Sequence, residues 1–140
     1  MKYSKKEHGY GYDGIYNFIA LKNDCIAQTD WIIGFYQGDA IACFIRKDGA
    51  VGLLDHTYGS CSGCDDYQAT DRNWNDDTCD ELVKMADEYE ANVRWLSKEE
   101  QLKRCEELWL EGQAGYHCDK EDFTKTYREE IPAFINANAK

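Results

Sequence analysis

Three short apolar segments in the first half of the chain are spaced like the strands of a β-meander. They are rich in β-branched and aromatic residues and lie at residues 31–36, 41–46 and 50–54. The connections between them are Gln37-Gly38-Asp39 and Asp48-Gly49. Because Asp-Gly favours the left-handed backbone of a tight hairpin turn, the pattern predicts three antiparallel strands in sequence order.

Apolar residues at helical spacing occur on both sides of this meander. Between Ile15 and Ile26 they recur every three or four positions, which predicts a helix with Asp13 as its N-cap. The Gly- and Tyr-rich residues 3–14 before it are expected to form a loop. After the meander, a capping box at residues 78–81 predicts the start of a second, amphipathic helix.

The rest of the chain predicts a short strand and two more helices. Residues 93–96 alternate inward and outward as in a strand, and residues 97–100 form a second capping box. The helix that this box starts is expected to end at Gly112, since glycine suits the left-handed residue that follows a helix. A final helix begins after Asp119, and Pro132 kinks or restarts it.

The order of these elements predicts an α+β fold. We expect a small antiparallel sheet, made of the three-stranded meander and one added strand, with three to four helices packed on one face. The sequence contains no internal repeat, low-complexity tract or linker. We therefore expect residues 1–140 to form a single domain.

The composition indicates a folded protein with a large negative charge. Of the 140 residues, 43% are hydrophobic, which is too much core material for a disordered acidic tail. The 16 Lys and Arg residues face 27 Asp and Glu residues, so the net charge is −11. No apolar run approaches the roughly 18 residues of a membrane span, and the N-terminus lacks the apolar segment of a signal peptide. We expect no membrane contact and a cytoplasmic location.

The acid is concentrated in residues 65–90, where ten acidic residues face Arg72 and Lys84 alone, a net charge of −8. Such a surface repels DNA, so we expect no direct nucleic-acid binding and a basic protein surface as the partner. Trp74 lies in a polar loop and is expected to anchor that partner. The candidate partner-binding residues are Asp65, Asp66, Asp71, Trp74, Asp76, Asp77, Asp80, Asp87 and Glu88.

One short motif points to other chemistry, the box YGSCSGCD at residues 58–65. Cys61 and Cys64 are spaced as in the knuckle of a zinc ribbon, but a tetrahedral site needs four ligands. Cys79 and Cys118 would have to complete it, because a second Cys-x-x-Cys is missing. The other interpretations of the box are a thiol-redox pair and a reduced, well-packed turn without metal.

The same box resembles a known group of proteins. Over about residues 50–100 the chain is similar to small phage-encoded proteins that carry a Tyr-x-Ser-Cys-Ser-Gly-Cys-Asp box after a β-meander. The resemblance implies a setting rather than an activity, because small acidic phage proteins bind and disable host machines. It places the protein in the cytoplasm of a bacterial host cell.

The sequence lacks the common catalytic motifs, among them the nucleophile elbow, the P-loop and the dinucleotide fingerprint. A nucleophilic pair of His56 with Cys61 or Cys64 is the remaining catalytic arrangement, and we favour a strand-end His56 that makes one hydrogen bond. We predict a non-enzymatic acidic binding protein without a cofactor. It is expected to be a phage-encoded inhibitor, a DNA mimic that engages the basic nucleic-acid-binding groove of a host protein such as a defence nuclease complex.

Three alternatives to this function remain. In the first, the chain is a small zinc-binding or thiol-redox protein that uses the Cys61/Cys64 box, with zinc as its cofactor. In the second, it is a homodimer joined through a sheet edge or an aromatic patch. In the third, the acidic helix face is only solvated and keeps the protein soluble.

Overall fold

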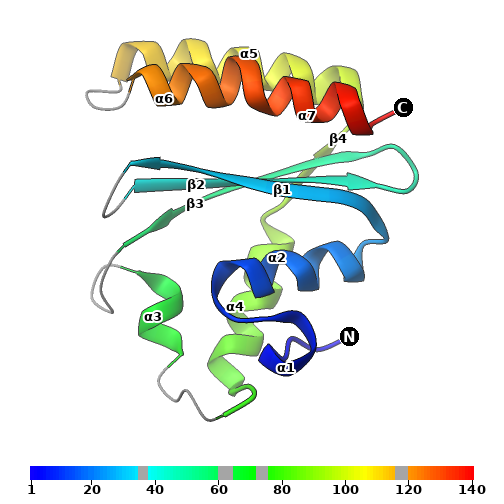
Figure 1. The fold of residues 1–140 in the computed structure, drawn as a ribbon, viewed down its shortest axis with the longest axis vertical. Coiled ribbons are helices and arrows are strands. Elements are labelled where there is room, and N and C mark those ends of the chain that lie inside the picture. Colours follow the sequence, from blue (N-terminus) through cyan, green and yellow to red (C-terminus); the bar gives the residue numbers. More distant parts are fainter. Residues whose placement is uncertain (35–37, 60–64, 72–75, 116–119) are drawn as a thin grey trace.

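A four-stranded antiparallel sheet lies at the centre of the molecule, in the order β1-β2-β3-β4 (Figure 1). The structure is a computed structural model and describes residues 1–34, 38–59, 65–71, 76–115 and 120–140. It confirms the α+β class, the meander and the added fourth strand. The strands are β1 (Cys25–Gly34), β2 (Gly38–Arg46), β3 (Val51–Tyr58) and β4 (Arg94–Leu96).

The turn between β2 and β3 is the one that Asp-Gly predicts. Gly49 has a φ of +95°, in the left-handed region that favours glycine, and its N–H donates to the Arg46 carbonyl over 2.9 Å. The strands pair directly on either side of it, with Ile45 opposite Val51. On the far edge of β3, Leu53 pairs with Arg94 of β4, which has only three residues.

Helices cover both faces of the sheet, so the prediction that they pack on one face is wrong (Figure 1). On one side lie α1 (Lys5–His8), α2 (Gly11–Lys22), α3 (Asp66–Thr70) and α4 (Asp80–Ala91), and we call this set the N-terminal layer. On the other side lie α5 (Lys98–Gly115), α6 (Lys120–Thr124), the π-helical η1 (Lys125–Glu130) and α7 (Ile131–Asn138), the C-terminal layer. No helix in the described part of the chain is both long enough and apolar enough to cross a membrane.

The burial of β2 explains the second layer. Ala42 and Phe44 enter the core of the N-terminal layer, whereas Ile41, Cys43 and Ile45 enter the core of the C-terminal layer. A strand that is covered on both faces has a continuous apolar sequence instead of an alternating one. The run Ile-Ala-Cys-Phe-Ile therefore carried the signal for two helical layers.

Several helix boundaries differ from those predicted. The Tyr- and Gly-rich start is helical, since α1 lies within it and α2 begins at Gly11, so Asp13 lies in the first turn and is not the N-cap. The helix also ends early. Asp24 has a φ of 52°, which turns the chain out of the helix, and Cys25 then begins β1.

The two predicted capping boxes have different outcomes. The cap of α5 is confirmed, because the Glu100 N–H donates to Ser97 Oγ over 3.2 Å. The cap at Thr78 is wrong: α4 has Cys79 at its N-cap position, without a side-chain cap, and the Thr78 hydroxyl donates to the Cys79 carbonyl over 3.5 Å. The position of Gly112 is also different, because it lies inside α5 and not at its end.

Candidate functional site

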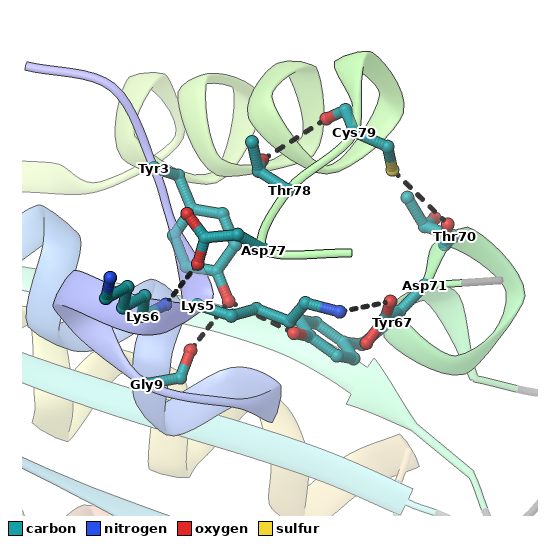
Figure 2. A network of polar contacts seen from close by, with 10 residues as sticks. All are labelled: Tyr3, Lys5, Lys6, Gly9, Tyr67, Thr70, Asp71, Asp77, Thr78 and Cys79. Carbon is teal, nitrogen blue, oxygen red and sulfur yellow. Dashed lines mark hydrogen bonds and ion pairs between the residues drawn. The ribbon is translucent and has the colours of Figure 1, made fainter. Parts of the chain in front are cut away.

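Part of the acidic segment is used inside the N-terminal layer, where Asp71 accepts a hydrogen bond from Lys5 (Figure 2). The Lys5 Nζ lies 2.9 Å from Asp71 Oδ1, and the lysine side chain is 1% exposed. Burial alone would lower the pKa of Lys5, but the hydrogen bond and the charge of Asp71 reverse this and leave the pKa raised. Beside this pair, the hydroxyls of Tyr3 and Tyr67 lie 3.0 Å apart.

Asp77 holds the chain before α4 against α1 (Figure 2). Its carboxylate accepts from the Ser4 hydroxyl over 2.7 Å and from the Lys6 N–H over 2.5 Å. These hydrogen bonds lower the pKa of Asp77. The Lys5 N–H also donates to the Asp77 carbonyl, over 2.9 Å, so this segment is bound to α1 through backbone and side chain.

Asp65 is buried and serves as the N-cap of α3. Its carboxylate accepts from the N–H groups of Gln68 and Gly59, over 3.0 and 2.8 Å, and from the Tyr12 hydroxyl over 3.1 Å. The side chain therefore has a structural role in joining α3 to α2 and to the end of β3. Asp65, Asp71 and Asp77 are all held by contacts within the layer.

The other candidate acids point to solvent. They are spread over α3, the segment before α4 and α4 itself: Asp66, Asp76, Asp80, Asp87 and Glu88. Lys22 lies 3.8 Å from Asp87, and Lys84 lies 3.9 Å from Glu88. Exposed ion pairs of this length contribute little, so Asp87 and Glu88 keep most of their negative potential at the surface. Trp74 lies outside the described residues.

The same layer contains a tyrosine-lined pocket of about 380 Å³, which was not expected from the sequence. Tyr12, Tyr16 and Tyr67 line it, together with the carboxylates of Asp30 and Asp65. Burial raises the pKa of Asp30, and the nearby charge of Asp13 adds to this shift. Tyr12 and Tyr16 lie one turn apart on α2, a spacing that places both on one side of the helix, but the predicted loop over residues 3–14 separated Tyr12 from the helix.

His56 lies beside this pocket in contact with three tyrosines. Its Nδ1 donates to the Thr57 carbonyl over 2.9 Å, so the Nε2 accepts from the Tyr16 hydroxyl over 2.5 Å. Its ring centroid lies 4.4 Å from that of Tyr12 and 5.0 Å from that of Tyr89. His56 thus makes two hydrogen bonds instead of the single one expected, and burial lowers its pKa.

The tyrosines keep their protons, which decides what this pocket can do. Burial raises the pKa of Tyr12 to about 12 and raises the pKa of Tyr16 and Tyr89 as well. Neutral phenols are hydrogen-bond donors and present the negative faces of their rings, but they are poor bases and nucleophiles. Tyrosine rings and carboxylates are the groups that bind cations in proteins.

The described thiols offer no reactive centre. Burial raises the pKa of Cys25 to about 11 and of Cys105 to about 12, and it raises the pKa of Cys43 as well. Cys79 donates weakly to the Thr70 carbonyl, with 3.9 Å between the two atoms (Figure 2). The remaining residues of the predicted zinc or redox site, Cys61, Cys64 and Cys118, lie outside the described residues, so that alternative stays a prediction.

No group of His, Cys, Asp and Glu side chains within the described ranges has the arrangement of a metal site. Comparison with protein-family models, curated proteins and solved structures finds no match. Function is therefore argued from the site alone. The N-terminal layer carries the outward carboxylates, and it also contains the tyrosine-lined pocket.

Proposed function

We propose that the chain is an acidic binding protein whose N-terminal layer engages a basic, nucleic-acid-binding surface of a partner protein. The setting we propose is that of a phage-encoded inhibitor of a host protein, such as a defence nuclease complex. The observation that supports the proposal is that this layer carries exposed carboxylates and also contains a tyrosine-lined pocket. The charge attracts a basic surface, and the pocket gives one of its side chains a place to dock.

The pocket fits the side chain of an arginine or lysine. Cations bind over the faces of tyrosine rings, and arginine does so more often than lysine. Asp30 supplies a carboxylate at the same pocket. At its rim, Tyr10 is 62% exposed and Ile32 is 59% exposed, which adds apolar area of the kind found around interface anchors.

The outward acids supply the long-range part of the interaction. Four of them lie on the segment before α4 and on α4: Asp76, Asp80, Asp87 and Glu88. A surface of this sign speeds association with a cationic groove and excludes nucleic acid from the same place. Added salt screens exposed charges, so binding is expected to weaken between low and high ionic strength.

Charge reversal tests the proposal without disturbing the fold. One variant carries Lys at Asp76, Asp80, Asp87 and Glu88. The control carries Lys at four exposed acids of the C-terminal layer, which changes the net charge equally: Glu106, Glu111, Glu121 and Glu129. Both proteins, and the wild type, are used as bait in a bacterial lysate at low and high salt, and their melting temperatures are compared.

The expected result is specific to the layer. Wild type and control retain a basic protein at low salt, added DNA displaces that protein, and the first variant fails to retain it while its melting temperature stays near that of the control. Equal retention by all three baits rejects the proposal, as does a bound protein that DNA does not displace. Tyr10→Ala then tests the pocket, because loss of an exposed ring weakens docking without loss of core packing.

A further inference from the structure

The two edges of the sheet differ in length. β4 forms one edge and has three residues, whereas β1 forms the other and has ten. No described strand pairs with the outer side of β1, and in Figure 1 no described helix or strand passes in front of it. A long edge strand presents a row of backbone N–H and C=O groups to another chain, and a very short one presents few. β1 is therefore the edge to which a further strand can be added.

The sequence of β1 lacks most of the devices that prevent such pairing. Edge strands are commonly protected by lysine, by proline or by a bulge that twists the edge away. β1 contains neither lysine nor proline, and its bulge lies at the start of the strand, between Cys25 and Ala27. From Ala27 to Gly34 the pairing with β2 is continuous. Residues 27–34 are thus a regular template for another strand.

Solvent reaches β1 from its outer side. Of its ten residues only Ile33 is buried, whereas six of the nine residues of β2 are buried between the same two helical layers. Ile32 is 59% exposed, and the smaller Ala27 and Thr29 remain partly exposed. An added strand would remove apolar surface of Ile32 from water, which favours its binding.

One charged residue selects the kind of strand that fits. Asp30 is exposed and is the only charged side chain of β1. It lies on the same face of the strand as Ile32, and both line the tyrosine-lined pocket. Asp13 of α2 lines this pocket as well, and neither carboxylate forms an ion pair with a described residue. Opposite charges on directly opposed residues of an antiparallel pair attract, so a basic side chain is favoured opposite Asp30.

The same charge argues against a second copy of the chain as the occupant of this edge. The net charge of the protein is −11, so two copies repel each other. A strand with the sequence of β1 would also bring no basic residue, because β1 contains none. The strand that fits is extended and carries basic and apolar side chains at alternate positions.

We propose that the outer edge of β1 binds an extended basic segment of a partner protein as an added antiparallel strand. Main-chain hydrogen bonds along residues 27–34 give the affinity. An arginine or lysine opposite Asp30 and an apolar residue opposite Ile32 give the specificity. The antiparallel direction continues that of the other strand pairs. The inference rests on the proposed function for the nature of the partner, and it adds the way in which that partner is bound.

A short peptide with the complementary pattern tests the edge. In acetyl-TVTRTTV-amide, antiparallel pairing from Ile33 to Ala27 places the arginine opposite Asp30 and the first valine opposite Ile32. The control acetyl-RVTTTTV-amide has the same composition, but its arginine lies at the end and points to the other face. A third peptide is the first one methylated on the backbone nitrogens of two successive residues, one of which faces β1 in either register. The isotope-labelled full chain is titrated with each peptide, and the hydrogen exchange of its amides is then measured.

A pair of variants tests the edge from the side of the protein. Ile32→Lys places on the edge the residue that commonly blocks strand addition, and it repels a basic peptide. Leu110→Lys is the matched control, because Leu110 is 55% exposed and lies on α5 in the C-terminal layer. Both side chains are exposed, so the melting temperatures of the two variants should stay close to each other.

We expect the first peptide to bind the wild type and Leu110→Lys equally, and Ile32→Lys more weakly by about fivefold or more. The control peptide and the methylated peptide should lose about fivefold or more on the wild type. Binding of the first peptide should slow the exchange of every second amide within residues 27–34, because alternate N–H groups face an added strand. Contact through the arginine side chain alone would not produce this alternation.

The proposal is overturned if the first peptide does not bind, if the methylated peptide binds equally well, or if the alternating protection is absent. It is also overturned if the wild type is a dimer that Ile32→Lys makes monomeric, since a second copy then occupies the edge. Peptide binding without the alternation leaves the proposed function standing, because the arginine then docks by its side chain alone. The lysate test uses neither the peptides nor amide exchange, so the proposed function can fail while the edge still binds the peptide.

Discussion

The two helical layers are held to the same sheet by different kinds of contact. In the N-terminal layer, hydroxyls and charges take part in the core, where Tyr3 contacts Tyr67 and Lys5 contacts Asp71. The C-terminal layer is packed almost entirely through apolar side chains, among them Cys105, Phe123, Ile131 and Ile135. One layer is therefore sensitive to loss of a charge, and the other to a change of volume.

The comparison shows that an acidic segment is not the same as an acidic surface. Three of the candidate acids are held by groups of the N-terminal layer: Asp65, Asp71 and Asp77. The candidates on α4 face solvent. Reversing the acids that are held in this way would disturb the fold together with any binding, so the functional test has to use the other ones.

The largest expected effect comes from Lys5→Ala in the N-terminal layer. The substitution leaves the Asp71 carboxylate, whose side chain is 11% exposed, without its cation. Removing one partner of a buried ion pair lowers the free energy of unfolding by about 3 kcal/mol or more. Chemical denaturation measures it. Lys6→Ala is the control, because Lys6 is exposed and contributes its backbone N–H, and its free energy of unfolding should change by less than about 0.5 kcal/mol.

The matching change in the C-terminal layer is Gly112→Ala. A Cβ at this position would lie 2.1 Å from Cζ of Phe123, so the ring has to move. Overpacking costs about 1–3 kcal/mol, and the better helix propensity of alanine offsets about 1 kcal/mol of that. We expect a net loss of up to about 2 kcal/mol by chemical denaturation. The same substitution in a Phe123→Leu background should cost less; an equal loss in both backgrounds would mean that the ring is not the cause.

The features that the sequence predicted correctly depend on neighbouring residues. Asp48-Gly49 specifies a turn by its own backbone preferences, and Ser97 caps a helix through an amide three residues later. The short strand β4 is recognisable from its alternation and from the cap that follows it. Such signals are complete within a few residues, which is why they can be seen without knowing the fold.

The features that it missed depend on partners far along the chain. Gly112 looks like a helix end until Phe123 is known to lie against it, and Asp71 looks like a surface acid until Lys5 is placed beside it, 66 positions earlier. The tyrosine-lined pocket is likewise assembled from several elements. The presence of a second helical layer is an exception, because the continuous apolar run in β2 indicates it from neighbouring residues alone.

A smaller effect is expected from pH, through His56 at the edge of the N-terminal layer. Burial lowers its pKa in the folded protein, so the unfolded chain binds more protons below the ordinary value of 6.5. The free energy of unfolding should therefore fall as the pH is lowered from 7 to 5. His56→Gln should reduce this slope when denaturation is measured at both pH values. An unchanged slope would assign the pH dependence to other groups.

The smallest effect should come from Asp77, whose contacts with α1 are exposed. Hydrogen bonds from Ser4 and from the Lys6 N–H lower its pKa below the ordinary value of 3.8. Such a carboxylate stabilises the fold above that value, and this contribution is lost as the pH falls through the lowered pKa. Asp77→Asn should therefore be less stable than the wild type at pH 7, and the difference should vanish once the pH has fallen below the lowered pKa of Asp77. If the difference persists in acid, Asp77 stabilises the fold through the shape of its side chain and not through its charge. The Lys5–Asp71 pair would then be the charge interaction that distinguishes the N-terminal layer from the C-terminal layer.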